Sequence, residues 1–144
     1  MSLHQMPVQL RWADFDANFH LRHSAYYDFG ATARIDLFTR TGLTGDFFKQ
    51  NGFGPILLRE SAEFRREVTM QDTLTITTAL AGIRPNGSRF AIRHQIFKAN
   101  EVLAATIDIL GDWIDYQTRR LYQPTEPLTA FMLSLPRTTD FQFT

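Results

Sequence analysis

Residues 10–38, LRWADFDANFHLRHSAYYDFGATARIDLF, decide the fold of this chain. They predict the end of a strand, a polar loop and then the longest helix of the chain. Ser24 is the expected N-cap of that helix, because a serine hydroxyl accepts a hydrogen bond from an amide of the first turn. Asp28 then falls in or just after the first turn, where a negative charge suits the positive helix end. Arg40 and Gly42 stand where a C-terminal cation and a terminating glycine are expected.

This helix is apolar over much of its circumference, which is typical of a helix that is largely buried. Gly30 stands in its middle, where glycine costs roughly 1 kcal/mol relative to alanine. We therefore expect another backbone, that of a strand crossing the helix, to approach closely at Gly30. The apolar positions form two adjacent rows at helical spacing, which are Tyr26, Phe29, Ala33 and Leu37, and Tyr27, Ala31, Ile35 and Phe38.

The composition excludes several classes of protein. Fifteen basic and fifteen acidic side chains give no reason to expect a nucleic acid or a membrane surface as partner. The absence of cysteine excludes disulfides, thiolate metal sites and a cysteine nucleophile. The first residues lack a signal-peptide pattern, and no apolar run approaches the roughly 20 residues of a membrane span, so a cytoplasmic location is expected. The length of 144 residues predicts one domain, residues 1–144, with a core at about 7–127 and a short helix and tail at 128–144.

Alternation of apolar and polar residues predicts five strands. The clearest is residues 73–80, which are dense in β-branched side chains. An Asn-Gly pair at 86–87 indicates a hairpin turn, and Gly111 in mid-strand indicates a bulge or a close neighbour. Further helical turns are expected at 44–50, and a loosely held tail at 136–144. The predicted strands are residues 7–12, 56–68, 73–80, 90–96 and 102–114, with residues 51–55 as a loop before the second.

The order of these elements predicts the architecture. A strand, a long helix and four long strands follow one another, and the strands are joined by short connections. Short connections force neighbouring strands to pair antiparallel. A single buried helix against such a sheet makes a two-layer α+β domain. We therefore expect an antiparallel sheet of about five strands wrapped around one long central helix.

The loop and the start of the helix resemble a known family. Residues 14–26, DFDANFHLRHSAY, are similar to the Asp-x-Asp, Gly-His and Tyr motif of the hotdog-fold acyl-CoA thioesterases, in their 4-hydroxybenzoyl-CoA thioesterase-like branch. The resemblance extends over about residues 8–127 and implies the hotdog fold. The chain departs from the family pattern at three positions, where the usual glycine is Phe19 and the two usual asparagines are Arg22 and His23.

This resemblance implies a hydrolase of acyl thioesters and assigns its catalytic groups. The catalytic carboxylate is Asp16, and the donor to the thioester oxygen is the backbone amide of His23, at the positive N-terminus of the helix. Asp16 would act as a general base toward water or attack the thioester directly, and both routes stay open. A backbone donor tolerates any side chain except proline, so His23 is compatible with this role.

The resemblance also implies the substrate, which is an acyl-CoA or an acyl-carrier-protein thioester. No cofactor is expected apart from the coenzyme A of the substrate itself, and no metal, because the family motif accounts for the histidines and aspartates of the loop. Arginine forks suit phosphate oxygens, so Arg59 and Arg66 are further candidates for contacts with coenzyme A. The side chains expected to bind substrate are His20, Arg22, Tyr26, Arg65, Ser88 and Arg89.

Two more residues are interpreted as structural. Asp14 is expected to be a structural carboxylate of the loop. His94 alternates with apolar residues and is expected to be a buried sheet histidine with its hydrogen bonds satisfied.

Assembly and alternative functions complete the expectations. A sheet wrapped around one helix has unpaired edges, which invite pairing, so we expect a homodimer or a tetramer of dimers. A hotdog dehydratase or hydratase is an alternative, although the chain has no Gly-His-Phe-Pro-Gly motif. A non-catalytic acyl-binding hotdog protein is the other, since Phe19 and the missing asparagines depart from the thioesterase pattern.

Overall fold

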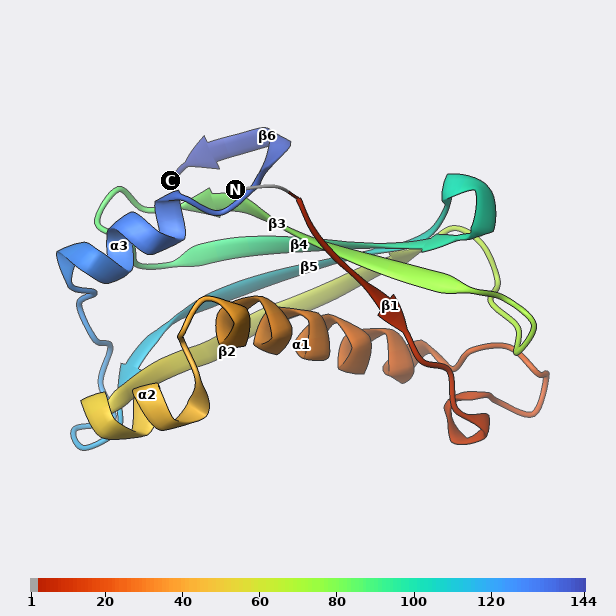
Figure 1. The fold of residues 1–144 in the computed structure, drawn as a ribbon, viewed down its shortest axis with the longest axis horizontal. Coiled ribbons are helices and arrows are strands. Elements are labelled where there is room, and N and C mark those ends of the chain that lie inside the picture. The colour runs from red at the N-terminus through yellow and green to blue at the C-terminus, as the bar shows by residue number, and fades with distance from the viewer. Residues whose placement is uncertain (1–2) are drawn as a thin grey trace.

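The computed structural model describes residues 3–144, and in it a sheet wraps around one long helix (Figure 1). Helix α1 (His23–Arg40) lies along one face of the sheet, with the shorter helices α2 (Gly45–Asn51) and α3 (Glu126–Leu133) near one end. This is the α+β hotdog fold that the sequence predicts. The strands are β1 (His4–Val8), β2 (Phe53–Phe64), β3 (Leu74–Ile83), β4 (Phe90–Lys98), β5 (Val102–Asp115) and β6 (Arg137–Phe143).

The order of the strands in the sheet is β1-β3-β4-β5-β2, and β6 also pairs with β3. Strands β3, β4 and β5 are antiparallel neighbours, as their short connections require. Strand β2 lies at the far side, where it pairs antiparallel with β5. The two sides of the sheet therefore differ. Strand β3 is covered by β1 and β6, whereas the twelve residues of β2 have no outer neighbour within residues 3–144.

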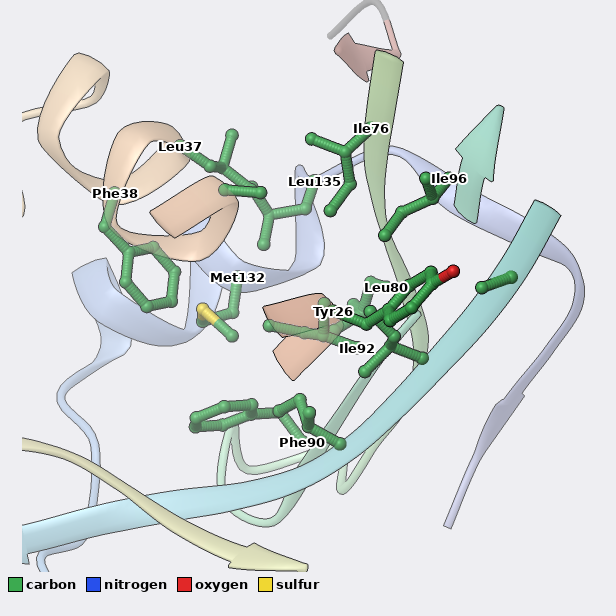
Figure 2. Packing of buried hydrophobic residues seen from close by; sticks show 14 of the residues in the cluster. Tyr26, Leu37, Phe38, Ile76, Leu80, Phe90, Ile92, Ile96, Met132 and Leu135 are labelled. Atoms are coloured by element: carbon green, nitrogen blue, oxygen red, sulfur yellow. The ribbon is translucent and has the colours of Figure 1, made fainter. Parts of the chain in front are cut away.

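The core lies between α1 and the inner face of the sheet (Figure 2). Tyr26 and Leu37 of the first predicted apolar row are buried there, and so is Phe38 of the second row. Burial of apolar surface, worth about 25 cal/mol per Å², is the main stabilising contribution. Ile35 is 65% exposed, however, so the second predicted row is only partly buried. The facing side chains are Ile76, Leu80, Phe90, Ile92 and Ile96 of the sheet, with Met132 of α3 and Leu135 just after it.

Aromatic rings fill the core near α2. Trp113 is fully buried, its ring centroid lies 5.1 Å from that of Phe90, and its indole N–H donates to the Gly87 carbonyl at 3.0 Å. Gly111 is needed beside this cluster, because a Cβ there would lie 2.5 Å from the Phe90 ring. The prediction of a close neighbour at Gly111 is confirmed. The other rings that pack around Trp113 are those of Phe38, Phe48 and Phe53.

Gly30 of α1 packs against the side chain of His94 on β4. A Cβ at Gly30 would lie 3.2 Å from His94 Cδ2. His94 is fully buried, with Arg34 Nη1 3.0 Å from its Nε2 and Thr78 Oγ1 3.0 Å from its Nδ1. Because arginine only donates, Nε2 accepts and Nδ1 carries the proton. The interpretation of His94 as a satisfied sheet histidine is confirmed. The close approach at Gly30 is also confirmed, although the neighbour is a side chain and not a backbone.

The first strand is earlier than the predicted residues 7–12. Strand β1 ends at Val8, and Trp12 begins a single 3₁₀ turn in which its side chain is 73% exposed. The carboxylate of Asp14 accepts the backbone N–H of Arg11 at 3.1 Å and closes this turn. This local bond competes with strand pairing, so the chain leaves the sheet after Val8 although the apolar alternation continues to Trp12.

Helix α1 begins at His23 with Arg22 as its N-cap, so the prediction of Ser24 as N-cap is wrong. The backbone N–H of Arg22 donates to the Asp14 carbonyl at 2.8 Å, which fixes the chain just before the helix. The Ser24 hydroxyl accepts from the guanidinium of Arg22 and not from a helix amide. Asp28 consequently lies beyond the first turn.

The other end of α1 and the start of α2 follow the sequence signals. Arg40 lies in the last turn of α1, and Gly42 has a φ of +94°, a conformation that favours glycine. The hydroxyl of Thr44 caps α2 by accepting the Phe47 N–H at 3.1 Å. The helical turns predicted at residues 44–50 therefore form.

Strand β2 begins and ends earlier than the predicted residues 56–68. Residues 54–55, predicted as loop, pair with β5. Proline is tolerated there because β2 is an edge strand, whose outer side needs no hydrogen-bond donor. The strand ends because the amides of residues 65 and 66 both donate to the Ala104 carbonyl, which stops the regular ladder.

The C-terminal residues form a strand, so the prediction of a loosely held tail at 136–144 is wrong. Strand β6 pairs parallel with β3, and the N–H of Leu80 donates to the Pro136 carbonyl at 2.7 Å. The Arg137 guanidinium lies 4.2 Å from the centroid of the Phe141 ring. Helix α3 turns the chain back to the part of β3 that the short β1 leaves uncovered. It begins at Glu126, two residues before the predicted start.

The burial of His94 predicts how stability depends on pH. Burial beside Arg34 lowers the pKa of His94 from 6.5 to about 3. The unfolded chain therefore binds this proton below pH 6.5 while the folded chain does not. The stabilisation that neutral His94 contributes to the folded state is therefore complete above pH 6.5 and is lost as the pH falls toward 3. At about 1.4 kcal/mol per pH unit, the free energy of unfolding at pH 5 falls by roughly 2 kcal/mol from its value at pH 7.5.

Urea titrations at both pH values measure this difference, and His94→Gln is the control. The variant lacks the titrating ring. Between pH 7.5 and pH 5 its free energy of unfolding therefore falls by about 2 kcal/mol less than that of the wild-type protein. Equal losses in the two proteins would show that His94 does not carry the effect.

Candidate active site

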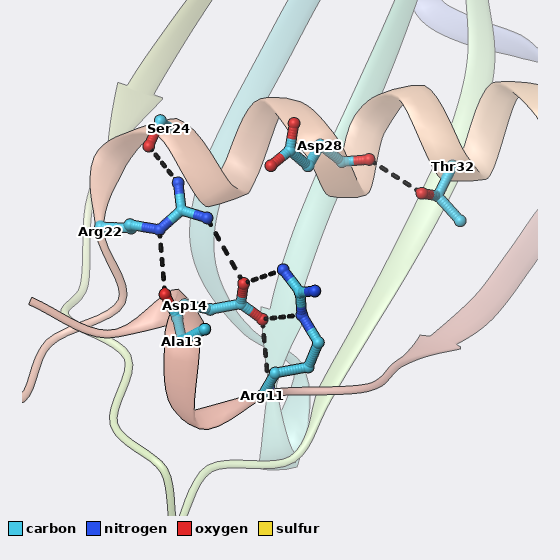
Figure 3. Close-up of polar contacts among 7 residues, drawn as sticks. All are labelled: Arg11, Ala13, Asp14, Arg22, Ser24, Asp28 and Thr32. Atoms are coloured by element: carbon cyan, nitrogen blue, oxygen red, sulfur yellow. Dashed lines mark hydrogen bonds and ion pairs between the residues drawn. The ribbon is translucent and has the colours of Figure 1, made fainter.

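A buried carboxylate organises the loop that leads into α1 (Figure 3). Asp14 is 1% exposed, and the guanidinium of Arg11 donates to it from Nη2 at 2.8 Å and from Nε at 3.3 Å. The guanidinium of Arg22 lies on its other side, with Nη2 3.6 Å from Oδ1. The hydrogen bond from Arg11 holds the pKa of Asp14 below its ordinary value. Asp14 therefore has a structural role, as the sequence predicts.

Asp16 lies two residues further along, on the exposed side of the loop. Its Oδ1 accepts the backbone N–H of Asn18 at 2.8 Å and that of His20 at 3.2 Å. Its own N–H donates to the His20 carbonyl at 2.9 Å, which closes a tight turn. The second carboxylate oxygen forms no hydrogen bond within residues 3–144. A carboxylate held in this way keeps one oxygen free to accept a proton or to attack.

The N-terminus of α1 presents free donors. Within the described chain, the backbone N–H groups of His23 and Ser24 have no hydrogen-bond acceptor. Unpaired amides at a helix start carry partial positive charge and favour a developing negative charge. A pocket of about 360 Å³ opens here between α1 and the end of β2. Its lining is Leu21, His23, Tyr26, Phe64, Arg65, Arg66 and Glu67.

Three of the side chains predicted from the sequence meet in this pocket, namely those of His23, Tyr26 and Arg65. Tyr26 forms the buried wall, where its ring centroid lies 4.9 Å from that of Phe64. Burial raises the pKa of the Tyr26 phenol, so the hydroxyl stays protonated. Arg65 is at the rim and pairs with Glu63 at 2.9 Å.

Four other predicted residues have intramolecular partners outside this pocket. His20 Nε2 lies 2.9 Å from Glu67 Oε2, at the edge of the pocket, and Arg22 belongs to the Asp14 cluster. Ser88 and Arg89 lie in the β3–β4 loop, at the opposite end of α1 from residues 14–22 (Figure 1). The Ser88 hydroxyl donates to Asn86 Oδ1 at 2.6 Å, and Arg89 Nε donates to Asp112 Oδ2 at 3.0 Å.

Sequence reasoning missed Phe64, Leu21 and Glu67 as pocket residues. Phe64 ends a strand and is 48% exposed, which periodicity alone does not reveal. In the described part of the chain, no three histidine, aspartate or glutamate side chains are placed to hold a metal ion. None of the helices between residues 3 and 144 is long and apolar enough to span a membrane.

The fold and this motif define the family. The model of the thioesterase-like superfamily matches residues 10–138, so the chain belongs to that superfamily. No curated protein sequence matches the chain.

Several solved structures are similar to this fold. A Staphylococcus aureus protein solved in complex with CoA is 17% identical, with a TM-score of 0.86 over 98% of this chain and 90% of that one. A 1,4-dihydroxy-2-naphthoyl-CoA thioesterase from Synechocystis is 16% identical, with a TM-score of 0.80 over 92% and 97%. A putative oleoyl thioesterase from Lactobacillus plantarum is 19% identical, with a TM-score of 0.83 over 99% of this chain and 58% of that one.

The two aspartates of the loop are expected to differ in their contribution to stability. Asp14→Ala leaves two guanidinium groups without their buried partner, so the free energy of unfolding falls by about 1–3 kcal/mol. Asp16→Ala removes only bonds to an exposed turn and costs less than about 1 kcal/mol. Urea denaturation of both variants measures the difference. Equal losses would contradict a structural role that is specific to Asp14.

Proposed function

We propose that this protein hydrolyses acyl thioesters of coenzyme A at the N-terminus of α1. The observation that carries the proposal is that the unpaired amides of His23 and Ser24 lie at a pocket, and that the loop seven residues before His23 exposes the carboxylate of Asp16, which does not itself line that pocket. A thioester carbonyl placed in the adjoining pocket has hydrogen-bond donors for its oxygen. The carboxylate supplies the base. These are the two groups that acyl transfer to water requires.

The reaction then follows ordinary acyl transfer. The oxygen of a water molecule attacks the thioester carbon while the free carboxylate oxygen of Asp16 takes the proton. The carbonyl oxygen becomes negative and accepts hydrogen bonds from the His23 and Ser24 amides. When the tetrahedral intermediate collapses, the carbon–sulfur bond breaks, protonated Asp16 gives its proton to the departing sulfur, and coenzyme A leaves as the thiol. Direct attack by Asp16, with an anhydride intermediate, is the other route that the same atoms allow.

Arginines next to the pocket support coenzyme A as the carrier of the acyl group. Arg65 and Arg66 lie at the pocket rim, and both side chains are exposed. Planar guanidinium groups suit phosphate oxygens. Structurally similar proteins include one solved with CoA and one described as a CoA thioesterase, in agreement with this choice. An acyl-carrier-protein thioester presents the same thioester and is the alternative substrate. Ser88 and Arg89 have no part in the proposal, because they lie at the other end of α1.

We also propose that the protein is a homodimer joined along β2. This strand has no outer neighbour among the described residues, and an unpaired edge is a template for pairing. Its side chains Leu57 and Leu58 are 51% and 44% exposed, and Ile35 on the adjoining face of α1 is 65% exposed. A second copy paired antiparallel to β2 covers these apolar groups and closes the open side of the pocket. A tetramer of dimers is compatible with the same contact.

Asp16→Asn is expected to abolish hydrolysis while leaving the fold intact, because an amide resembles a carboxylate in shape but takes no proton. Loss of a positioned base costs about 10²–10⁴-fold in kcat. The assay measures thiol release from a panel of short, long and aromatic acyl-CoAs. His23→Ala keeps most of the activity, since the donor is its backbone amide, whereas His23→Pro removes that donor and the activity.

The two His23 variants are compared at matched stability. If His23→Ala is as inactive as His23→Pro, the side chain performs the chemistry and the proposed oxyanion site is wrong. Wild-type rates in Asp16→Asn would remove Asp16 from the mechanism. Hydration of crotonyl-CoA without thiol release would replace the hydrolase with a hydratase.

Leu57→Asp is expected to dissociate the dimer, because it places a charge in the apolar seam along β2. Light scattering at micromolar concentration measures the mass, which falls from twice 16.6 kDa to 16.6 kDa. Leu3→Asp is the matched control, since Leu3 is similarly exposed, at 54%, but precedes β1 on the other side of the sheet. A wild-type protein that is already monomeric contradicts the proposal.

A further inference from the structure

A second hollow lies beside the candidate active site and has no role in the proposed hydrolysis. It measures about 260 Å³ and is formed by the loop before α1 and by the turn before β3. Three of its large side chains are exposed, namely Trp12 at 73%, Phe19 at 68% and Met70 at 38%. Exposed apolar side chains that cluster in one patch, in contrast to those scattered singly over a surface, mark binding sites. The remaining lining residues are Phe15, Asn18, His20, Thr69 and Gln71.

Phe19 is held in this hollow at a conformational cost. Its φ is +62°, in the left-handed region that costs an L residue roughly 1–2 kcal/mol. The tight turn around Asp16 enforces this backbone, because the Phe19 N–H donates to the Asp16 carbonyl at 3.0 Å. Glycine would avoid both the strain and the exposed ring. A strained residue whose side chain is also exposed is a sign of function at that side chain.

Most of the charged groups around the hollow are paired with one another. His20 pairs with Glu67 at 2.9 Å, and this pair forms the wall between the hollow and the pocket at His23. Lys98 lies 3.4 Å from Asp72 and Arg65 pairs with Glu63, whereas Asp16 has no cationic partner among the described residues. Within residues 3–144, Arg66 forms no ion pair. Its guanidinium donates to the Arg65 carbonyl at 3.0 Å and lines the pocket at His23, where its remaining N–H groups are available to an anion.

We propose that this hollow binds the adenine ring of coenzyme A, a proposal that rests on the proposed function. Flat bases stack on aromatic side chains with about 1–3 kcal/mol per base, and Trp12 and Phe19 offer such faces. Asn18 and Gln71 line the hollow, and each side-chain amide carries a donor and an acceptor, as does the adenine edge. The backbone between Phe19 and His23 spans at most about 14 Å. The bound coenzyme therefore folds back, with its phosphates near Arg66 and its thioester at the His23 amide.

Tryptophan fluorescence tests this placement directly. The chain has two tryptophans, and Trp113 is fully buried, so Trp12 alone reports on the surface. Adenosine 3′,5′-bisphosphate, the nucleotide part of coenzyme A, is expected to quench this emission saturably. Ribose 5-phosphate, which has no base, is expected not to quench it. An absence of quenching by the nucleotide overturns the proposal. The proposal is also overturned if the fluorescence of the free protein shows that Trp12 is buried, because another chain would then cover the hollow.

Variants separate stacking from a structural role. Trp12→Ala is expected to weaken binding of adenosine 3′,5′-bisphosphate about tenfold by calorimetry, and Trp12→Phe to restore it, because phenylalanine keeps a stacking face. Phe19→Gly is expected to raise the melting temperature by relieving the left-handed strain, while it weakens nucleotide binding. Unchanged nucleotide affinity in Trp12→Ala and Phe19→Gly overturns the proposal.

Steady-state kinetics distinguish this proposal from the proposed function. Trp12→Ala is expected to raise KM for an acyl-CoA about tenfold relative to KM for the same acyl group on pantetheine, which has no adenine. An equal rise for both substrates shows that the hollow holds the acyl group and overturns the proposal. If the nucleotide binds but no thioester is hydrolysed, the proposed function is wrong and the adenine site stands. Hydrolysis without nucleotide quenching overturns the adenine site alone.

Discussion

The buried carboxylate of Asp14 is the interaction on which the functional half of the structure depends. It accepts from the backbone and guanidinium of Arg11, and the guanidinium of Arg22 lies on its other side. A buried charge without partners is costly, so these groups hold one another in a single arrangement. That arrangement ends β1 early, bends residues 12–14 into a turn and directs the chain into α1 at His23. The unpaired amides and the Asp16 turn are consequences of this geometry.

The sheet and the core fix the position of the same helix. His94 and Gly30 let α1 approach β4 closely, and Arg34 reaches the ring of His94 from the helix. The core of aromatic and aliphatic side chains then fixes the axis of α1 relative to the sheet. The helix start therefore stands in a fixed place next to the end of β2, where Phe64 and Arg65 complete the pocket. Rigid support of this kind is what the proposed oxyanion site requires.

Different parts of the loop before α1 have different tasks. Asp14 faces inward and supports the fold, Asp16 is exposed and is the proposed base, and Phe19 exposes a ring at a conformational cost. Successive side chains of an extended or turning chain point to different sides, so one short segment serves the core and, in the proposals made above, also the reaction and the ligand. This explains how replacement of the usual glycine by Phe19 is compatible with the motif. The tight turn around Asp16 is kept, and only the surface beside it changes.

The sequence by itself determined the two-layer α+β fold, the central helix, three strands of the sheet and the motif that contains Asp16 and His23. These features depend on local periodicity and on short spacing, which a sequence displays directly. Only the tertiary structure decided the start of α1 at His23, the strand β6 and the neighbours of the pocket. The pocket and β6 depend on contacts between residues far apart in the chain, such as Tyr26 with Phe64 and Leu80 with Pro136, and the start of α1 depends on how Arg22 meets the buried Asp14. Local propensity does not encode such contacts, because they arise from the packing that the whole chain adopts.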